Sequence, residues 1–219
     1  MCRGGGAVTV RRPNVVVLDY GSGNLRSAQR AVERVGAAVT VTADLAAAAE
    51  ADGLVVPGVG AYAACMAGVE KIGAGPVVAA RVAAGRPVLG ICVGMQILYE
   101  LGDEHGVRTQ GLGLLAGEVR RLAAPVLPHM GWNTVRPPAG STLFGGLPAD
   151  TRFYFVHSYA AKPDLSAARR QAAPDTIAEH GEPFTAAVER GALCATQFHP
   201  EKSGDAGAHV LANWLSTLG

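Results

Sequence analysis

The chain has 219 residues, which is enough to bury a substantial core in one domain or in two small ones. Hydrophobic residues make up 49% and charged residues 17% of the chain, so the composition excludes a disordered protein and a coiled coil. The formal net charge of +1 provides no electrostatic basis for binding nucleic acid or an anionic membrane. We therefore expect a globular protein that binds neither.

The termini and the cysteines bear on location and on metal binding. No stretch approaches 18 apolar residues, and residues 1–6 contain no apolar core, so we expect no membrane span, no signal peptide and a cytoplasmic location. Cys2, Cys65, Cys92 and Cys194 are far apart and lack CxxC spacing, which predicts neither a disulfide framework nor a zinc site. We expect no metal and no cofactor.

The first half of the chain alternates strand and helix patterns. Residues 1–13 are rich in Gly and Arg and predict a flexible extension ahead of a single domain over 14–219. Short apolar runs that end in loops predict parallel strands, and the segments after them predict helices. The strands are expected at 14–20, 39–42, 54–56 and 87–91, and the helices at 25–35 and 93–100.

From about Glu118 the pattern changes to shorter, alternating segments. Residues 153–159, 184–188 and 194–198 predict antiparallel strands laid on the edge of the sheet, and residues 205–218 predict a closing helix. The predicted fold class is α/β, with an open, mostly parallel sheet flanked by helices and antiparallel edge strands in the C-terminal half.

Loops at the carboxyl ends of parallel strands gather at one rim, where ligands bind. At that rim, Gly-Ile-Cys-Val-Gly at residues 90–94 has the form of a nucleophile elbow with Cys92 in place of serine. A helix that starts directly after Cys92 would direct its backbone N–H groups at the sulfur and favour the thiolate. A free cysteine is more often a buried structural residue, and the motif alone leaves both readings open.

His199-Pro200-Glu201 is the second candidate. On an extended segment, side chains two residues apart face the same way, so Glu201 could orient the His199 ring. With Cys92 this gives a nucleophile, a base and a carboxylate for acyl transfer. An isolated His-x-Glu would be a chance pair on an edge strand, but its combination with an elbow favours the catalytic interpretation.

Pro-Gly-Val-Gly at residues 57–60 is the third candidate. Its glycines allow the backbone to approach a ligand, so an N–H of this loop could bind a developing oxyanion together with the amide of Val93. Taken by itself, the segment would be a plain glycine-rich turn.

These motifs together resemble the class I, triad-type glutamine amidotransferases. The resemblance is carried by residues 90–96 and 197–201, and it extends over 14–219. Within that family, further segments are similar to the glutaminase subunits of imidazole glycerol phosphate synthases, which act in histidine biosynthesis. These segments are 19–27, 57–60, 128–133, 154–159 and 199–203.

The resemblance implies that Cys92 attacks the side-chain amide of glutamine, His199 moves the protons and Glu201 holds His199. A glutamyl thioester forms, ammonia leaves, and water releases glutamate. The resemblance also implies an oxyanion hole shaped by Gly58, Val59 and Val93. In the family, the Val-Gly peptide of that loop is often turned away until the partner binds its own substrate.

Two further sets of residues follow from the resemblance. Those that hold glutamine are Gln96, Glu104, His157, Ser158 and Tyr159, although Glu104 could equally be a surface acid. Those that contact or gate the partner are Asn24, Trp132, Tyr154 and Lys202, although Trp132 and Tyr154 could equally be core residues.

Ammonia in water at neutral pH is mostly ammonium, which is not nucleophilic, so a glutaminase is expected to dock onto its ammonia acceptor. The resemblance implies a separate cyclase subunit, a (β/α)8 barrel bound one-to-one, that converts PRFAR to imidazole glycerol phosphate and AICAR. The alternatives are a glutaminase subunit of another synthase, a stand-alone thiol hydrolase, and a catalytically silent subunit that only stabilises a partner.

Overall fold

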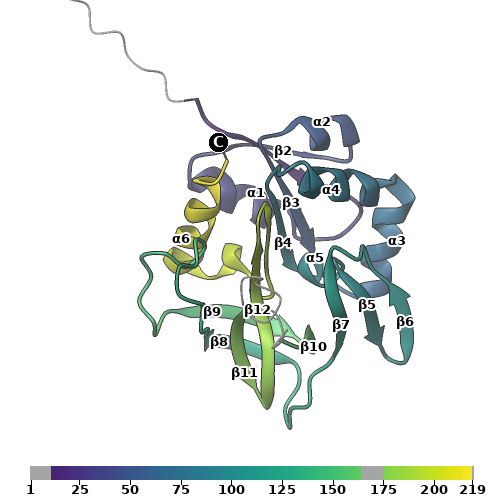
Figure 1. Cartoon of the computed structure of the whole chain (residues 1–219), viewed down its shortest axis with the longest axis vertical. Helices are drawn as coiled ribbons and strands as arrows, with labels where there is room; N and C mark the ends of the chain where they lie inside the picture. Colours follow the sequence, from purple (N-terminus) through teal and green to yellow (C-terminus); the bar gives the residue numbers. More distant parts are fainter. Residues whose placement is uncertain (1–10, 164–174, 219) are drawn as a thin grey trace, which may run out of the picture.

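The computed structural model describes residues 11–163 and 175–218, and a seven-stranded sheet forms its centre (Figure 1). The strand order is β11-β12-β13-β4-β3-β1-β2, in which β2, β1, β3, β4 and β13 are parallel and β11 and β12 are antiparallel to their neighbours. The predicted mostly parallel sheet with antiparallel edge strands is therefore confirmed. The strands are β1 (Asn14–Leu18), β2 (Ala38–Thr42), β3 (Gly53–Gly58), β4 (Val88–Cys92), β11 (Thr176–His180), β12 (Glu182–Arg190) and β13 (Leu193–Thr196).

The central strands form because their sequences are apolar on both faces. Every residue of β3 and β4 is buried, as is every residue of β1 after Asn14, as expected for parallel strands covered by helices on both sides. Helices α1 (Leu25–Arg34) and α6 (Gly204–Leu215) lie together on one side of these strands, and α2 (Leu45–Glu50), α3 (Tyr62–Ile72) and α4 (Ala74–Ala83) lie on the other (Figure 1).

Two smaller sheets stand at the carboxyl end of the parallel strands. One has four strands in the order β10-β7-β5-β6, and the other pairs β8 with β9. The strands are β5 (Tyr99–Glu104), β6 (Val107–Gln110), β7 (Leu115–Arg121), β8 (His129–Thr134), β9 (Arg152–His157) and β10 (Tyr159–Ala161). The chain passes from one small sheet to the other through Ser158, which brings residues 157–159 to the rim that holds the β4 loop.

Three expectations about elements need correction. The helix expected over 93–100 is a single turn, α5 (Val93–Gln96), because the carbonyls of Ile97 and Leu98 accept hydrogen bonds from the backbone of residues 112–115 and the chain enters β5 at Tyr99. Residues 153–159 do not lie on the edge of the main sheet; they divide between the two small sheets. Strand β13 is parallel to β4 rather than antiparallel, because the turn after β12 returns the chain alongside β4.

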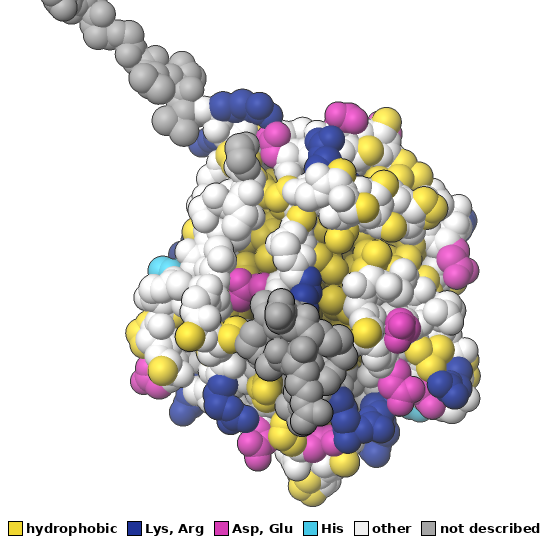
Figure 2. Space-filling model, viewed as in Figure 1, with side chains coloured by type: hydrophobic (Ala, Val, Ile, Leu, Met, Phe, Trp, Pro, Cys, Tyr) yellow, Lys and Arg dark blue, Asp and Glu magenta, His cyan; other side chains and the backbone are white. Residues whose placement is uncertain are grey.

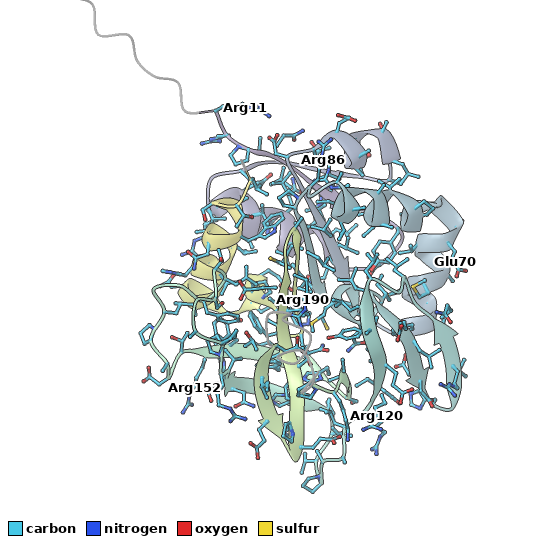
Figure 3. The ribbon with its side chains drawn as sticks, in the orientation of Figure 1. Arg11, Glu70, Arg86, Arg120, Arg152 and Arg190 are labelled. Atoms are coloured by element: carbon cyan, nitrogen blue, oxygen red, sulfur yellow. The ribbon has the colours of Figure 1, made fainter. Side chains whose placement is uncertain are left out.

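The ends of the parallel strands can be followed in Figure 3. Arg11 and Arg86 lie where β1 and β4 begin, whereas Arg120 and Arg152 lie at the opposite end, beside the smaller sheets. Arg11 binds both carboxylate oxygens of Asp52, at 2.9 and 2.8 Å. The predicted extension over 1–13 falls mostly on residues 1–10, which lie outside the described residues, as does Cys2.

Charged side chains of both signs are interspersed over the face shown in Figure 2, in keeping with the formal net charge of +1. Among the described residues, no single helix has the length and apolar composition needed to cross a membrane; only α3 and α4 taken together meet that test, and they are bent by 88°.

Candidate active site

Cys92 stands at the tip of a tight turn between β4 and α5. Its backbone angles are φ 56° and ψ −113°, a strained conformation for a residue with a side chain. The turn packs so closely on β3 that a Cβ at Gly94 would lie 1.9 Å from the Val56 carbonyl oxygen. The glycines of the motif are therefore required by close backbone contact, and the turn lifts Cys92 to the carboxyl edge of the sheet.

His199 and Glu201 lie beside Cys92 after the end of β13. His199 Nδ1 and Glu201 Oε1 are 2.7 Å apart, and the two side chains are 2% and 3% exposed. Burial by itself would lower the pKa of His199, but hydrogen bonds with Cys92 and Glu201 outweigh it and raise that pKa to about 9. The imidazole is therefore held as a cation at neutral pH, next to the sulfur.

The local backbone here differs from the extended segment expected from the sequence. His199 is extended, but Glu201 lies in the short helix η2 (Pro200–Lys202). Pro200 fixes the first position of that helix, and the Ser203 hydroxyl donates to the His199 carbonyl at 2.7 Å. A tight turn, rather than strand alternation, thus brings the carboxylate back onto the ring.

Asn24 adds a fourth group to this chain of hydrogen bonds. Its Nδ2 donates to Glu201 Oε1 at 3.0 Å, across 177 residues of sequence. Asn24 has a φ of 69° and occupies the N-cap of α1 without capping the helix through its side chain. Asparagine tolerates this left-handed conformation better than most residues, and here the side chain is directed to the carboxylate that orients His199.

The loop after β3 lies against the elbow. A Cβ at Gly58 would lie 2.3 Å from the Gly94 backbone nitrogen, so only glycine permits this approach. The N–H of Val59 donates to the Ser22 hydroxyl at 2.9 Å, and the Cys65 thiol donates to the Val59 carbonyl at 3.5 Å. In this conformation the Val59 amide, an expected oxyanion donor, is directed at Ser22.

A pocket of about 620 Å³ opens in front of Cys92. The residues expected at the site that line it are Val59, Cys92, Val93, Gln96, Glu104, His157, Ser158, Tyr159, His199 and Lys202. Gly58, Asn24, Trp132, Tyr154 and Glu201 are not among the described residues that line it; Asn24 and Glu201 stand behind His199. Within the described parts of the chain, no group of three His, Cys, Asp or Glu side chains is arranged to hold a metal ion.

Comparison with known proteins agrees with this geometry. The family "Glutamine amidotransferase class-I" matches residues 16–218. The chain belongs to the class I glutamine amidotransferases. It is 65% identical over 208 residues to the Mycobacterium tuberculosis H37Rv protein named "Imidazole glycerol phosphate synthase subunit HisH", covering 94% of this chain and 98% of that one.

A second relative of the same name, from Thermobifida fusca, is 60% identical over 210 residues, covering 94% of this chain and all of the relative. Among solved structures, "Structure of PurLQS from Thermotoga maritima" superposes with a TM-score of 0.70 at 20% identity, covering 95% of this chain and 100% of that one. The structural likeness bears on the fold alone, which is that of this amidotransferase family.

Several residues expected to hold glutamine in this amidotransferase already have partners within the protein. Glu104 accepts a hydrogen bond from the N–H of Tyr62 at 2.7 Å, at the start of α3. His157 uses both ring nitrogens, one toward the Tyr159 carbonyl and one toward His129, each at 3.0 Å. These hydrogen bonds fix the Glu104 and His157 side chains in the wall of the pocket.

The pKa values of His157 and His129 are shifted in the opposite direction to that of His199. Burial lowers the pKa of His157 to about 3, with a smaller contribution from His129. Burial likewise lowers the pKa of His129 to about 4, helped by His180. Both rings are therefore neutral at physiological pH, because burial disfavours their charged form.

The residues expected to face a partner lie on the β8–β9 ribbon and next to it. Trp132 is 54% exposed and Met130 62% exposed, so Trp132 is not a core residue. The rings of Trp132 and Tyr154 meet edge to face at 5.9 Å. Lys202 is exposed beside the pocket, which leaves an apolar surface with a cationic edge near the mouth of the site.

Sequence reasoning gave no role to Ser22, His129 or Gln197, which contact the site through hydrogen bonds. All three lie inside segments that carried the family resemblance. Their partners are remote in sequence, so only the tertiary structure shows what they bind.

Proposed function

We propose that the chain is the glutaminase subunit of an imidazole glycerol phosphate synthase, which hydrolyses glutamine and passes the ammonia to a separate cyclase subunit. The observation that carries this proposal is the buried arrangement of Cys92, His199 and Glu201, of which Cys92 and His199 line the pocket. The identity of 65% to a protein named as this subunit supports the choice of synthase.

The first half of the reaction uses the Cys92 sulfur as the nucleophile and the His199 ring as the proton donor. The Cys92 thiolate attacks the side-chain carbonyl carbon of glutamine, and the carbonyl oxygen takes up negative charge. His199, held as an imidazolium by Glu201, donates its proton to the departing amine. The C–N bond breaks, ammonia leaves, and a glutamyl thioester remains on Cys92.

The second half regenerates the enzyme. His199, now neutral, takes a proton from water as the water oxygen attacks the thioester carbonyl. The C–S bond breaks, glutamate leaves, and the proton on His199 restores the imidazolium–thiolate pair. Asn24 donates to the carboxylate oxygen that contacts His199, so the Glu201 side chain is held against the ring through both halves of the reaction.

Both tetrahedral intermediates need hydrogen-bond donors for their oxyanion. Val93, which follows the nucleophile, and Val59 are the candidate donors. Because the Val59 N–H is bound to Ser22 in this conformation, we propose that docking of the cyclase with its nucleotide substrate turns the Gly58–Val59 peptide toward the pocket. Glutaminase activity would then be low until ammonia has an acceptor.

The cyclase, a (β/α)8 barrel bound one-to-one, is proposed to cover the pocket mouth and to contact Trp132, Tyr154 and Lys202. The exposed apolar area on the β8–β9 ribbon suits an interface that excludes water from the ammonia path. We place the reaction in the cytoplasm, where the reducing environment keeps a thiol nucleophile free of disulfides.

The test uses the complex with the cyclase and two nitrogen sources. The complex containing Cys92→Ala should convert the nucleotide substrate with ammonium salt but not with glutamine, while the unaltered complex uses both. Glutamine-dependent turnover by the variant would refute the thioester mechanism. A failure of the unaltered chain to support any glutamine-dependent reaction with this cyclase would assign it to another synthase.

A further inference from the structure

A chain of amide hydrogen bonds connects the backbone of Tyr159 to the nucleophile. Gln96 Nε2 donates to the Tyr159 carbonyl at 2.8 Å and to Gln197 Oε1 at 3.0 Å. Gln197 Nε2 in turn lies 3.7 Å from Cys92 Sγ, within hydrogen-bonding range of a sulfur acceptor. Gln96 and Gln197 are 5% and 1% exposed, so water competes little for these groups.

The orientation of the Gln96 and Gln197 side-chain amides follows from the carbonyl oxygen of Tyr159. The Tyr159 carbonyl can only accept, so the Gln96 group that faces it is the NH2. The second hydrogen of that NH2 faces Gln197, so the Gln197 atom that receives it is the oxygen. The NH2 of Gln197 is then on the side of Cys92, and it can only donate to the sulfur.

The Tyr159 carbonyl is itself held from a second direction. His157 Nδ1 donates to it at 3.0 Å, and His157 Nε2 then accepts from His129 Nδ1 at 3.0 Å. His129 Nε2 accepts from Asn133 Nδ2 at 3.2 Å. Neutral rings are needed for these roles, and the lowered pKa values of His157 and His129 keep them neutral.

We propose that Gln197 is a further catalytic residue, which donates a hydrogen bond to the Cys92 thiolate from the side away from the pocket, and that Gln96 is the positioning residue that fixes its orientation. Cys92, Gln96 and His199 line the pocket, whereas Gln197 is buried behind it. Two donors, His199 and Gln197, thereby share the thiolate. This role rests on the thioester mechanism proposed above.

The direct test measures how fast iodoacetamide alkylates Cys92 as a function of pH, with the modified peptide quantified by mass spectrometry. Gln197→Met keeps the size of the side chain and removes the donor. A hydrogen bond to a charged group corresponds to roughly one pH unit, so the midpoint of the alkylation profile should rise by about one unit.

Two further variants and a control separate this role from a structural one. Gln197→Glu should shift the midpoint further, because a carboxylate oxygen then faces the sulfur, and Gln96→Met should shift it less. Thr196→Val removes a buried hydrogen bond from the end of β13 to the Phe198 carbonyl, next to Gln197, and should leave the midpoint unchanged. Unfolding temperatures establish that each variant is folded.

A Gln197→Met protein with an unchanged alkylation midpoint would overturn the proposal, as would equal shifts in Thr196→Val. Steady-state kinetics of the complex give a second readout: kcat for glutamine should fall, and KM should change little because Gln197 does not line the pocket. Alkylation needs no glutamine turnover, so it decides the role of Gln197 even if Cys92→Ala refutes the proposed function.

Discussion

The loops after β4 and β3 lie side by side at the rim of the sheet, but only one of them is arranged for reaction. At the β4 loop, Cys92 already faces His199, which Glu201 holds at 2.7 Å. At the β3 loop, the Val59 amide donates to Ser22. The nucleophile half of the site, which is Cys92 with His199 and Glu201, is thus assembled. In the oxyanion half, which is the loop after β3, the proposed donor Val59 is bound to Ser22.

The energies explain why this difference can serve as a control point. The triad is held by charge-assisted hydrogen bonds among buried groups, which are the strong kind. The Val59–Ser22 contact is a single neutral hydrogen bond, with a net value of about 1 kcal/mol. A docked partner can replace the second arrangement more readily than the first, which is why we place the proposed regulation on the loop after β3.

The largest expected effect tests the nucleophile half. Cys92→Ala should lower glutamine turnover by at least about 10⁴-fold, because removal of a nucleophile eliminates the covalent route. Glutamate release measured on the complex checks this, with the unfolding temperature as the control for folding. Turnover within tenfold of the unaltered protein would contradict the assignment.

Glu201→Gln should lower turnover by about 10²- to 10⁴-fold, in the range seen when the orienting carboxylate of a triad is neutralised. The carboxylate helps raise the pKa of His199 to about 9, so its loss should also move the alkaline limb of the pH profile to lower pH. Rate measurements across the neutral to alkaline range test both. An unchanged rate and limb would remove Glu201 from the triad.

Asn24→Gly should lower kcat by about tenfold, because Glu201 loses one of its two donors. Glycine accepts the φ of 69° at this position, so the substitution removes the side chain without adding backbone strain. If Asn24 acts only at the partner interface, the variant should instead weaken binding of the cyclase and leave basal glutamate release unchanged. Titration of the complex distinguishes the two outcomes.

Ser22→Ala tests the oxyanion half and should raise the rate of glutamate release, whereas the preceding substitutions lower it. Loss of a bond worth about 1 kcal/mol frees the Val59 peptide, so glutamate release by the chain alone should rise by about fivefold. Stimulation by the cyclase and its nucleotide should shrink by the same factor. A basal rate equal to that of the unaltered protein would show that Ser22 does not hold the loop.

The smallest effect concerns stability at the two ends of the pH range. The pKa of His199 is raised, so its stabilisation is complete below about 6.5 and is lost as pH rises through about 9. The pKa values of His129 and His157 are lowered, so unfolding takes up protons as pH falls from about 6.5 toward 4, and stability drops there. Denaturant unfolding at several pH values should show both declines.

The Cys92→Ala protein should show a smaller alkaline decline and an unchanged acidic one, since it removes one of the two partners that raise the pKa of His199 and leaves the other two histidines in place. An undiminished alkaline decline would separate that effect from the contact between Cys92 and His199.

The sequence was informative where local pattern and burial agree. The apolar runs that end in glycine-rich loops correctly indicated β1, β3 and β4, and the motifs placed Cys92, His199 and Glu201 at one rim. It was misleading where short segments satisfy two patterns: residues 97–100 continue a helical pattern, yet the carbonyls of Ile97 and Leu98 bond to the backbone of residues 112–115 and the chain enters β5. The single helical turn after Cys92 could not be foreseen from periodicity.

The contacts that modify the site were beyond the reach of sequence reasoning. Gln197 meets Cys92 across 105 residues, and Ser22 meets Val59 across 37. Gln197 and Ser22 lie in segments that carry the family resemblance, but the directions of their side chains depend on how separate strands pack. Residue type and spacing carry no information about such directions, which is why the contact of Asn24 with Glu201 was not expected.

The most direct test of the central claim is the rate of glutamate release from glutamine by the purified chain alone, with the cyclase barrel, and with the barrel plus its nucleotide substrate. An assembled triad beside a diverted oxyanion amide predicts weak release from the chain alone and a strong rise only in the complete mixture. Fast release by the chain alone, indifferent to the barrel, would contradict both the held oxyanion loop and the choice of partner.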